Sequence, residues 1–251
     1  MILQNMTPQE KVAQMEKLRP SLISCAREWV DRPYNSKLLF KKTKSFPSFY
    51  TFEKEIDGMG RWSIVISIES KSLMRKEYYG ISAYQTYFIS GGKDESNNGI
   101  GLYLFSVYDY NIDLSKCEEF PPHYFNQFRK RFIESRGLVQ PSFSDLIKIV
   151  LRELSESVNE IHKAGGDGIK PGYDNFINYS KNGISLGLSC VDGRYSNYTT
   201  YISKEMLKDG QLMAQTENLK NLSLSGFWHK VNNDPLEMWN SYDYCFKKKM
   251  E

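Results

Sequence analysis

The chain has 251 residues, of which 40% are hydrophobic and 25% charged, and its net charge is +3. These values are typical of a globular protein and exclude disorder over most of the chain. The mild positive charge permits an anionic partner but does not by itself indicate one. We expect a single α+β domain over residues 1–251, with residues 111–121 as the one candidate internal boundary.

The N-terminus and the cysteines indicate the cellular compartment. The first residues lack the charged segment and apolar run of a signal peptide, and the longest apolar stretches are too short to span a bilayer. The four cysteines are far apart and form no C-x-x-C pair. We therefore expect a cytoplasmic protein with no membrane contact, no metal and no cofactor, and the sequence leaves its oligomeric state open.

The first predicted helix has a strong start signal. Thr7, Pro8 and Glu10 have the pattern of an N-cap, a proline in the first turn and a capping-box glutamate. Apolar residues follow at helical spacing, namely Val12, Met15, Leu18 and Leu22. Pro20 is expected to interrupt this helix and to open a second piece that ends near residues 31–33.

Four strand-like segments come next, and glycine-rich turns separate several of them. They predict a four-stranded antiparallel meander because apolar and polar residues alternate along them. Their limits are Ser48–Ile56, Arg61–Glu69, Ser82–Ser90 and Ile100–Tyr108.

The second half of the chain has a similar mixture of elements. A central helix pair is predicted over residues 122–135 and from Ser142 or Ser144 to Lys163. Three short strands should form a second, small antiparallel sheet, at Phe176–Tyr179, Ile184–Val191 and Tyr198–Ser203. Two C-terminal helices are expected to begin at Ser203 and Asp234.

His123 is the residue that most suggests chemistry, since the chain has only three histidines and this one follows two prolines at a helix start. The positive end of the helix dipole favours a neutral imidazole there, which can accept a proton. Arg131, with Arg129 beside it, could bind phosphate oxygens and stabilise a developing negative charge. The plain alternative is that His123 caps the helix and that both arginines are solvated.

The layout of His123, Arg131 and the later strand that holds Thr200 and Tyr201 resembles small toxin-type domains of bacterial mobile elements. Those domains are related to the RelE and colicin-like ribonuclease fold group. The resemblance covers about Pro121 to Ser203, and Gln127 stands where an H-x3-R-x3-R pattern has its first arginine. It implies metal-independent RNA cleavage, with His123, Arg131 and Tyr201 as catalytic residues and Arg129 and Thr200 as substrate-binding residues.

Two other functions remain open, and neither needs catalysis. Lys41, Lys42 and Lys44 could bind single-stranded nucleic acid together with more distant cations and two tyrosines, because stacking and positive charge combine in such sites. The additional residues are Lys54, Arg61, Lys71, Arg75, Lys76, Tyr78 and Tyr79. Alternatively, the chain could be a non-enzymatic interaction protein of a phage or mobile element that binds another protein through its aromatic meander, since aromatic residues are enriched at interface hot spots.

Overall fold

A computed structural model of the chain describes residue 2 and residues 4–90, 99–107, 116–155, 157–162 and 172–224. Helices and strands both occur throughout these residues, so the α+β class is confirmed. None of the helices in the described ranges is long and apolar enough to cross a membrane. The expected helix from Asp234 lies outside the described residues.

One mixed sheet of nine strands forms the centre of the structure, in the order β1-β2-β3-β4-β5-β9-β8-β7-β6. All neighbouring strands are antiparallel except β5 and β9, which pair in parallel. The strands are β1 (Ser48–Ile56), β2 (Gly60–Ile68), β3 (Gly80–Ile89), β4 (Gly99–Val107), β5 (Lys116–Phe120), β6 (Val158–His162), β7 (Asp174–Ser180), β8 (Gly183–Cys190) and β9 (Tyr195–Ser203).

The predicted division into a four-stranded meander and a second short sheet is therefore wrong. β5 extends the meander to five strands, and its parallel pairing with β9 joins both groups into one sheet. β5 is only five residues long and has no turn signal that links it to β9. The pairing of Cys117 with Tyr195 spans most of the second half of the chain, so local sequence patterns do not contain it.

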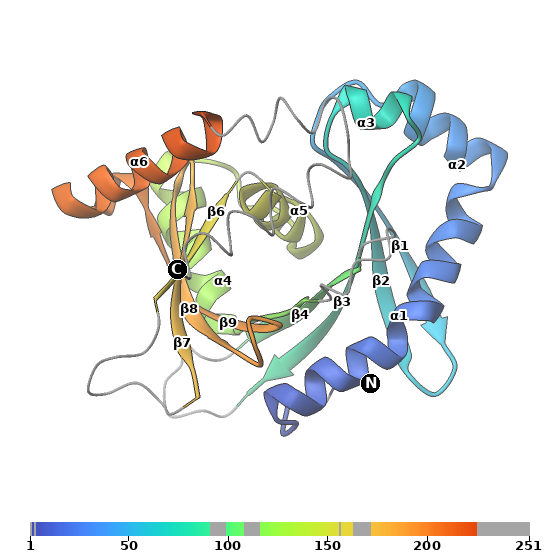
Figure 1. Cartoon of the computed structure of the whole chain (residues 1–251), viewed down its shortest axis with the longest axis horizontal. Coiled ribbons are helices and arrows are strands. Elements are labelled where there is room, and N and C mark those ends of the chain that lie inside the picture. The colour runs from blue at the N-terminus through green and yellow to red at the C-terminus, as the bar shows by residue number, and fades with distance from the viewer. Residues whose placement is uncertain are drawn as a thin grey trace.

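Helices cover both faces of this curved sheet. Figure 1 shows the sheet bending around α4 (Pro122–Phe128) and α5 (Phe143–Ser155), with α1 (Pro8–Val30) on the opposite face. Two hydrophobic cores correspond to the two faces: one contains the buried side of α1, and the other contains α4 and α5. Along β2, Ile64 and Ile66 belong to the first core and Val65 to the second, as the alternation of a strand requires.

α1 begins at the predicted capping box but does not break at Pro20. The Thr7 side chain accepts from the Glu10 backbone N–H, and the Glu10 carboxylate accepts from the Thr7 N–H. The helix continues through Pro20 to Val30. A proline costs about 3 kcal/mol inside a helix. The fully buried Leu18 and Leu22 on either side of it offset that cost by packing against the sheet.

Short helical segments connect the strands. After α1 come α2 (Pro33–Lys37), a π-helix (Leu38–Lys42) and, beyond the first hairpin, α3 (Lys71–Arg75). α4 continues as a π-helix (Arg129–Ile133) and a 3₁₀ turn (Glu134–Arg136). A second 3₁₀ turn (Lys204–Met206) precedes α6 (Asp209–Leu224), where the sequence predicted one helix from Ser203.

The predicted helix up to Lys163 is also too long. α5 ends at Ser155, and residues 158–162 form the edge strand β6, which pairs with β7. Val158 and Ile161 fit a helical period, and they fit a strand equally well over so short a stretch. The free edge of β7 decides between the two, because pairing satisfies backbone groups of both strands.

Candidate functional site

The structure brings together three of the five residues predicted for an active site. The Arg131 Nη1 donates to the Tyr201 carbonyl oxygen at 2.6 Å and lies 3.4 Å from Thr200 Oγ1. This contact joins the π-helix after α4 to β9. The guanidinium therefore has a structural partner, and the bond goes to a backbone carbonyl rather than to the tyrosine hydroxyl.

Tyr201 faces the protein interior. Only 1% of its surface is exposed, and its ring packs against Phe128 and Phe132 at centroid distances of 4.7 and 6.2 Å. A bulge in β9, where Leu186 pairs with Thr200 and Gly187 with Tyr198, places Tyr198 and Tyr201 on the same face. Burial raises the pKa of the Tyr201 hydroxyl well above its usual value, so it holds its proton.

The other two predicted residues lie on α4 and just beyond it. His123 is half-buried in the first turn of α4, and Arg129 is half-buried where α4 meets the π-helix. Eight helical residues, about 12 Å along the axis, separate His123 from Arg131. The site predicted from the sequence is thus assembled only at the Arg131, Thr200 and Tyr201 contact.

A second cluster of charge lies under α1, and the sequence reasoning missed it. Lys11, which is 4% exposed, forms an ion pair with Glu119 at 2.7 Å. The hydroxyls of Tyr87 and Tyr195 also donate to the Glu119 carboxylate. Burial, followed by the charge of Glu119, raises the pKa of both tyrosines. The signal that could have revealed this cluster is a lysine on the buried stripe of an amphipathic helix.

Within this cluster, the ion pair of Lys11 with Glu119 ties α1 to the sheet. The Lys11 ammonium also lies 4.8 Å from the centre of the Tyr103 ring. The neighbouring Cys117 is buried, and burial raises the pKa of its thiol, which makes it a poor nucleophile. We therefore assign this cluster a structural role.

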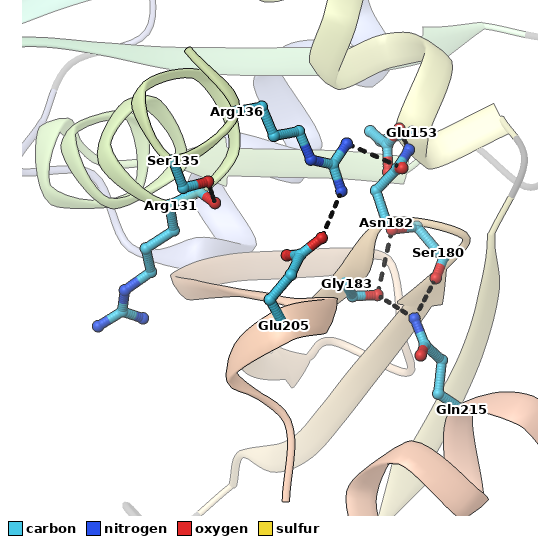
Figure 2. A network of polar contacts seen from close by, with 9 residues as sticks. All are labelled: Arg131, Ser135, Arg136, Glu153, Ser180, Asn182, Gly183, Glu205 and Gln215. Atoms are coloured by element: carbon cyan, nitrogen blue, oxygen red, sulfur yellow. Dashed lines mark hydrogen bonds and ion pairs between the residues drawn. The ribbon is translucent and has the colours of Figure 1, made fainter.

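A third polar network ties the end of the sheet to α6, and it is shown in Figure 2. Arg136 donates to Asn182 Oδ1 at 3.0 Å and pairs with Glu205 at 3.2 Å. Gln215 of α6 donates to the Ser180 carbonyl at 2.6 Å. The Arg131 side chain points away from this network in the same view. These contacts join the 3₁₀ turn after α4 and α6 to the sheet, so we assign this network a structural role as well.

The cations at the opposite end of the sheet are arranged differently. We define the basic patch as the cations of α2, of its π-helix and of α3, with those next to them. They are Arg32, Lys37, Lys41, Lys42, Lys44, Lys71, Arg75 and Lys76, all of which are exposed. Residues 32–44 contain five of these cations and no carboxylate. Figure 1 shows α3 beside α2 at one end of the molecule.

Packing between aromatic rings brings the two parts of the basic patch together. Phe40 of the π-helix contacts Tyr79, just after α3, with ring centroids 6.3 Å apart. Leu39 is fully buried and anchors the π-helix, while the Ser70 hydroxyl caps α3 by accepting from the Leu73 N–H at 3.2 Å. Two segments that carry exposed cations, about 30 residues apart in the sequence, therefore lie side by side.

Two cations that the sequence grouped with this surface lie elsewhere. Lys54 and Arg61 are at the turn of the β1–β2 hairpin, and Arg61 pairs with Glu53 at 3.4 Å. The other end of the hairpin leads to the basic patch. Six strand residues separate Lys54 from Ser48, a distance of about 20 Å. Lys54 and Arg61 therefore do not belong to the basic patch.

Comparison with protein-family models, with curated proteins and with solved structures gave no match. The resemblance to toxin-type ribonuclease domains therefore stays a prediction. Within the described ranges, no group of three or more histidine, cysteine or acidic side chains is placed to hold a metal ion.

Proposed function

We propose that this protein binds nucleic acid through the basic patch. The observation that supports this proposal is that the Phe40 and Tyr79 contact holds the π-helix beside α3, two segments whose lysines and arginines are all exposed. A concentrated basic face is the electrostatic footprint of a nucleic-acid-binding protein, whereas the net charge of only +3 shows that cations are not in excess everywhere.

The local charge supports the same proposal. The carboxylates closest in sequence to α3 are Glu69 and Glu77. Burial raises the pKa of Glu69, which weakens its tendency to carry a negative charge. Lysine and arginine side chains that contact phosphates release condensed counterions, so binding should fall steeply as salt rises.

The experiment is a salt titration of binding to a fluorescent RNA of about 15 nucleotides, the upper range of a compact single-strand site. The test variant is Lys41→Ala/Lys42→Ala/Arg75→Ala. The control, Lys181→Ala/Lys204→Ala/Lys208→Ala, removes the same charge from exposed lysines at the other end of the sheet. The slope of log affinity against log salt should become shallower by about 2 in the test variant only.

An equal loss in both variants would show that only net charge matters and would contradict the proposal. Failure of the wild-type protein to bind RNA at low salt would also contradict it, and would favour the protein-partner function instead. Both outcomes are read from the same titration.

Metal-independent RNA cleavage is a second candidate, which we propose because Arg131 lies beside Thr200 and Tyr201. The wild-type protein should then cleave RNA in the presence of EDTA, and His123→Ala should abolish this cleavage. Intact RNA after prolonged incubation with the wild-type protein would remove this candidate without affecting the binding proposal.

A further inference from the structure

We infer that the basic patch selects single-stranded nucleic acid by stacking a base on Tyr34. This inference rests on the proposed function and adds the class of ligand to it. Tyr34 lies in α2, and 70% of its surface is exposed. The sequence reasoning assigned stacking to Tyr78 and Tyr79 and overlooked Tyr34.

The Tyr34 ring lies among the cations of the basic patch. Lys42 Nζ lies 5.8 Å from the centre of the ring. Lys37, three residues later in the helix, lies on the same side of α2 as Tyr34. A base stacked on this ring would have its own phosphates close to Lys37 of α2 and Lys42 of the π-helix.

Tyr34 is exposed, although other aromatic rings in this part of the molecule pack against one another. Phe40 and Tyr79 are half-buried, and their rings contact each other. The rings of Trp29 and Phe52 are also half-buried and stack with their centroids 5.1 Å apart. Lys42 lies over one face of the Tyr34 ring. The high exposure of Tyr34 leaves ring surface available to a ligand.

A hydrogen bond attaches α2 to the end of α1. Asn35 Nδ2 donates to the Trp29 carbonyl at 2.8 Å, which fixes α2 against the end of α1. Pro33 occupies the first turn of α2, and the buried Leu39 follows in the π-helix. A ring presented on a fixed element loses less conformational entropy when a ligand binds.

Stacking on a side chain distinguishes single strands from duplexes. In a duplex the faces of the bases are covered by neighbouring base pairs, so a double strand offers mainly phosphates to the basic patch. An unpaired base exposes its face and can use the phosphate contacts and the tyrosine ring together. Such stacking contributes a factor of about 5 to 150 in affinity per base.

The experiment compares binding of one RNA sequence as a single strand and as a blunt duplex. Tyr34→Ala should weaken single-strand binding by about 5- to 150-fold and leave duplex binding unchanged. Tyr34→Phe should retain the wild-type preference, because it keeps the ring. Phe88→Ala, at a ring that is 64% exposed on β3, is the control and should change neither affinity.

Two results would overturn the inference while the proposed function stands. One is an equal affinity of Tyr34→Ala and the wild-type protein for the single strand. The other is an equal loss for single strand and duplex. If neither RNA binds the wild-type protein at low salt, the proposed function itself fails, and the inference fails with it.

Discussion

In the α4–β9 region a half-buried arginine contacts the backbone of a buried tyrosine, whereas in the α2–α3 region an exposed lysine lies over the ring of an exposed tyrosine. Arg131 donates to the Tyr201 backbone, and the Tyr201 ring is buried. Lys42 lies over Tyr34, which is exposed. Each region pairs a cationic side chain with a tyrosine. Residue type alone therefore does not distinguish a structural contact from a candidate binding surface.

The difference lies in what the fold places within reach of each cation. Cations that are at least partly buried contact a carbonyl or a carboxylate, as Arg131 contacts the Tyr201 carbonyl and Lys11 contacts Glu119. The basic patch contains a stretch of five cations without a carboxylate. We therefore expect substitutions of inward cations to reduce stability and substitutions in the basic patch to reduce binding.

The largest effect on stability should come from alkaline pH, through the buried tyrosines. The pKa values of Tyr87, Tyr195 and Tyr201 are raised above the usual 10, and that of Tyr179 is raised to about 12, with burial as the first cause. A raised folded-state pKa means that stability is complete below pH 10 and is lost above it, because only the unfolded state ionises readily.

We therefore expect cooperative unfolding between about pH 10 and 12, followed by circular dichroism. Absorbance near 295 nm should show that part of the tyrosines ionise only as the protein unfolds. Ionisation of all tyrosines in a protein that stays folded would contradict the burial of these four side chains.

The next largest effect should follow from breaking the buried ion pair under α1. Glu119→Ala leaves Lys11 buried without its charge partner and should lower the free energy of unfolding by about 3–5 kcal/mol. Urea unfolding measures this change. The double variant Lys11→Met/Glu119→Leu removes both charges and should recover much of the loss. A loss below about 1 kcal/mol in Glu119→Ala, as at an exposed pair, would show that this cluster is not buried.

Charge reversal in the basic patch should produce the opposite pattern. Lys41→Glu/Lys42→Glu should weaken RNA binding by about 100-fold at low salt, because both attractive contacts become repulsive. Its free energy of unfolding should stay within about 0.5 kcal/mol of the wild-type value, since both side chains are exposed. If this variant loses stability but keeps its affinity, the roles of the two regions are reversed.

A smaller effect on stability is expected from the contact between the π-helix and β9. Arg131→Met removes the donor to the Tyr201 carbonyl and should lower the free energy of unfolding by about 1–3 kcal/mol, without weakening RNA binding. Thr200→Val is a milder change at the same contact. Unchanged stability together with a large loss of binding in Arg131→Met would make the α4–β9 region the functional one.

Local sequence signals predicted the local parts of the fold. The capping box of α1 and the limits of β1 are confirmed to the residue. The parallel pairing of β5 with β9 could not be predicted, because the partners lie far apart in the chain. The edge strand β6 was mistaken for helix because a pattern of five residues fits both periods until a neighbouring strand selects one.

The site was predictable only as a set of residue types. The sequence identified lysines and arginines that could contact phosphate. It could not show that Arg131 would donate a hydrogen bond to the Tyr201 backbone carbonyl. The sequence also grouped Lys54 with the cations of the basic patch, although the length of the β1–β2 hairpin separates Lys54 from them. Tyr34 was overlooked because its exposure depends on how α2 lies against the rest of the protein.

The most direct test is to map where RNA lies on the protein by ultraviolet crosslinking of an oligonucleotide that contains 4-thiouridine, followed by mass spectrometry. Our account predicts crosslinks in the peptides that contain residues 33–44 and 71–79. Crosslinks confined to peptides from α4 and β9, around His123, Arg131 and Tyr201, would contradict it.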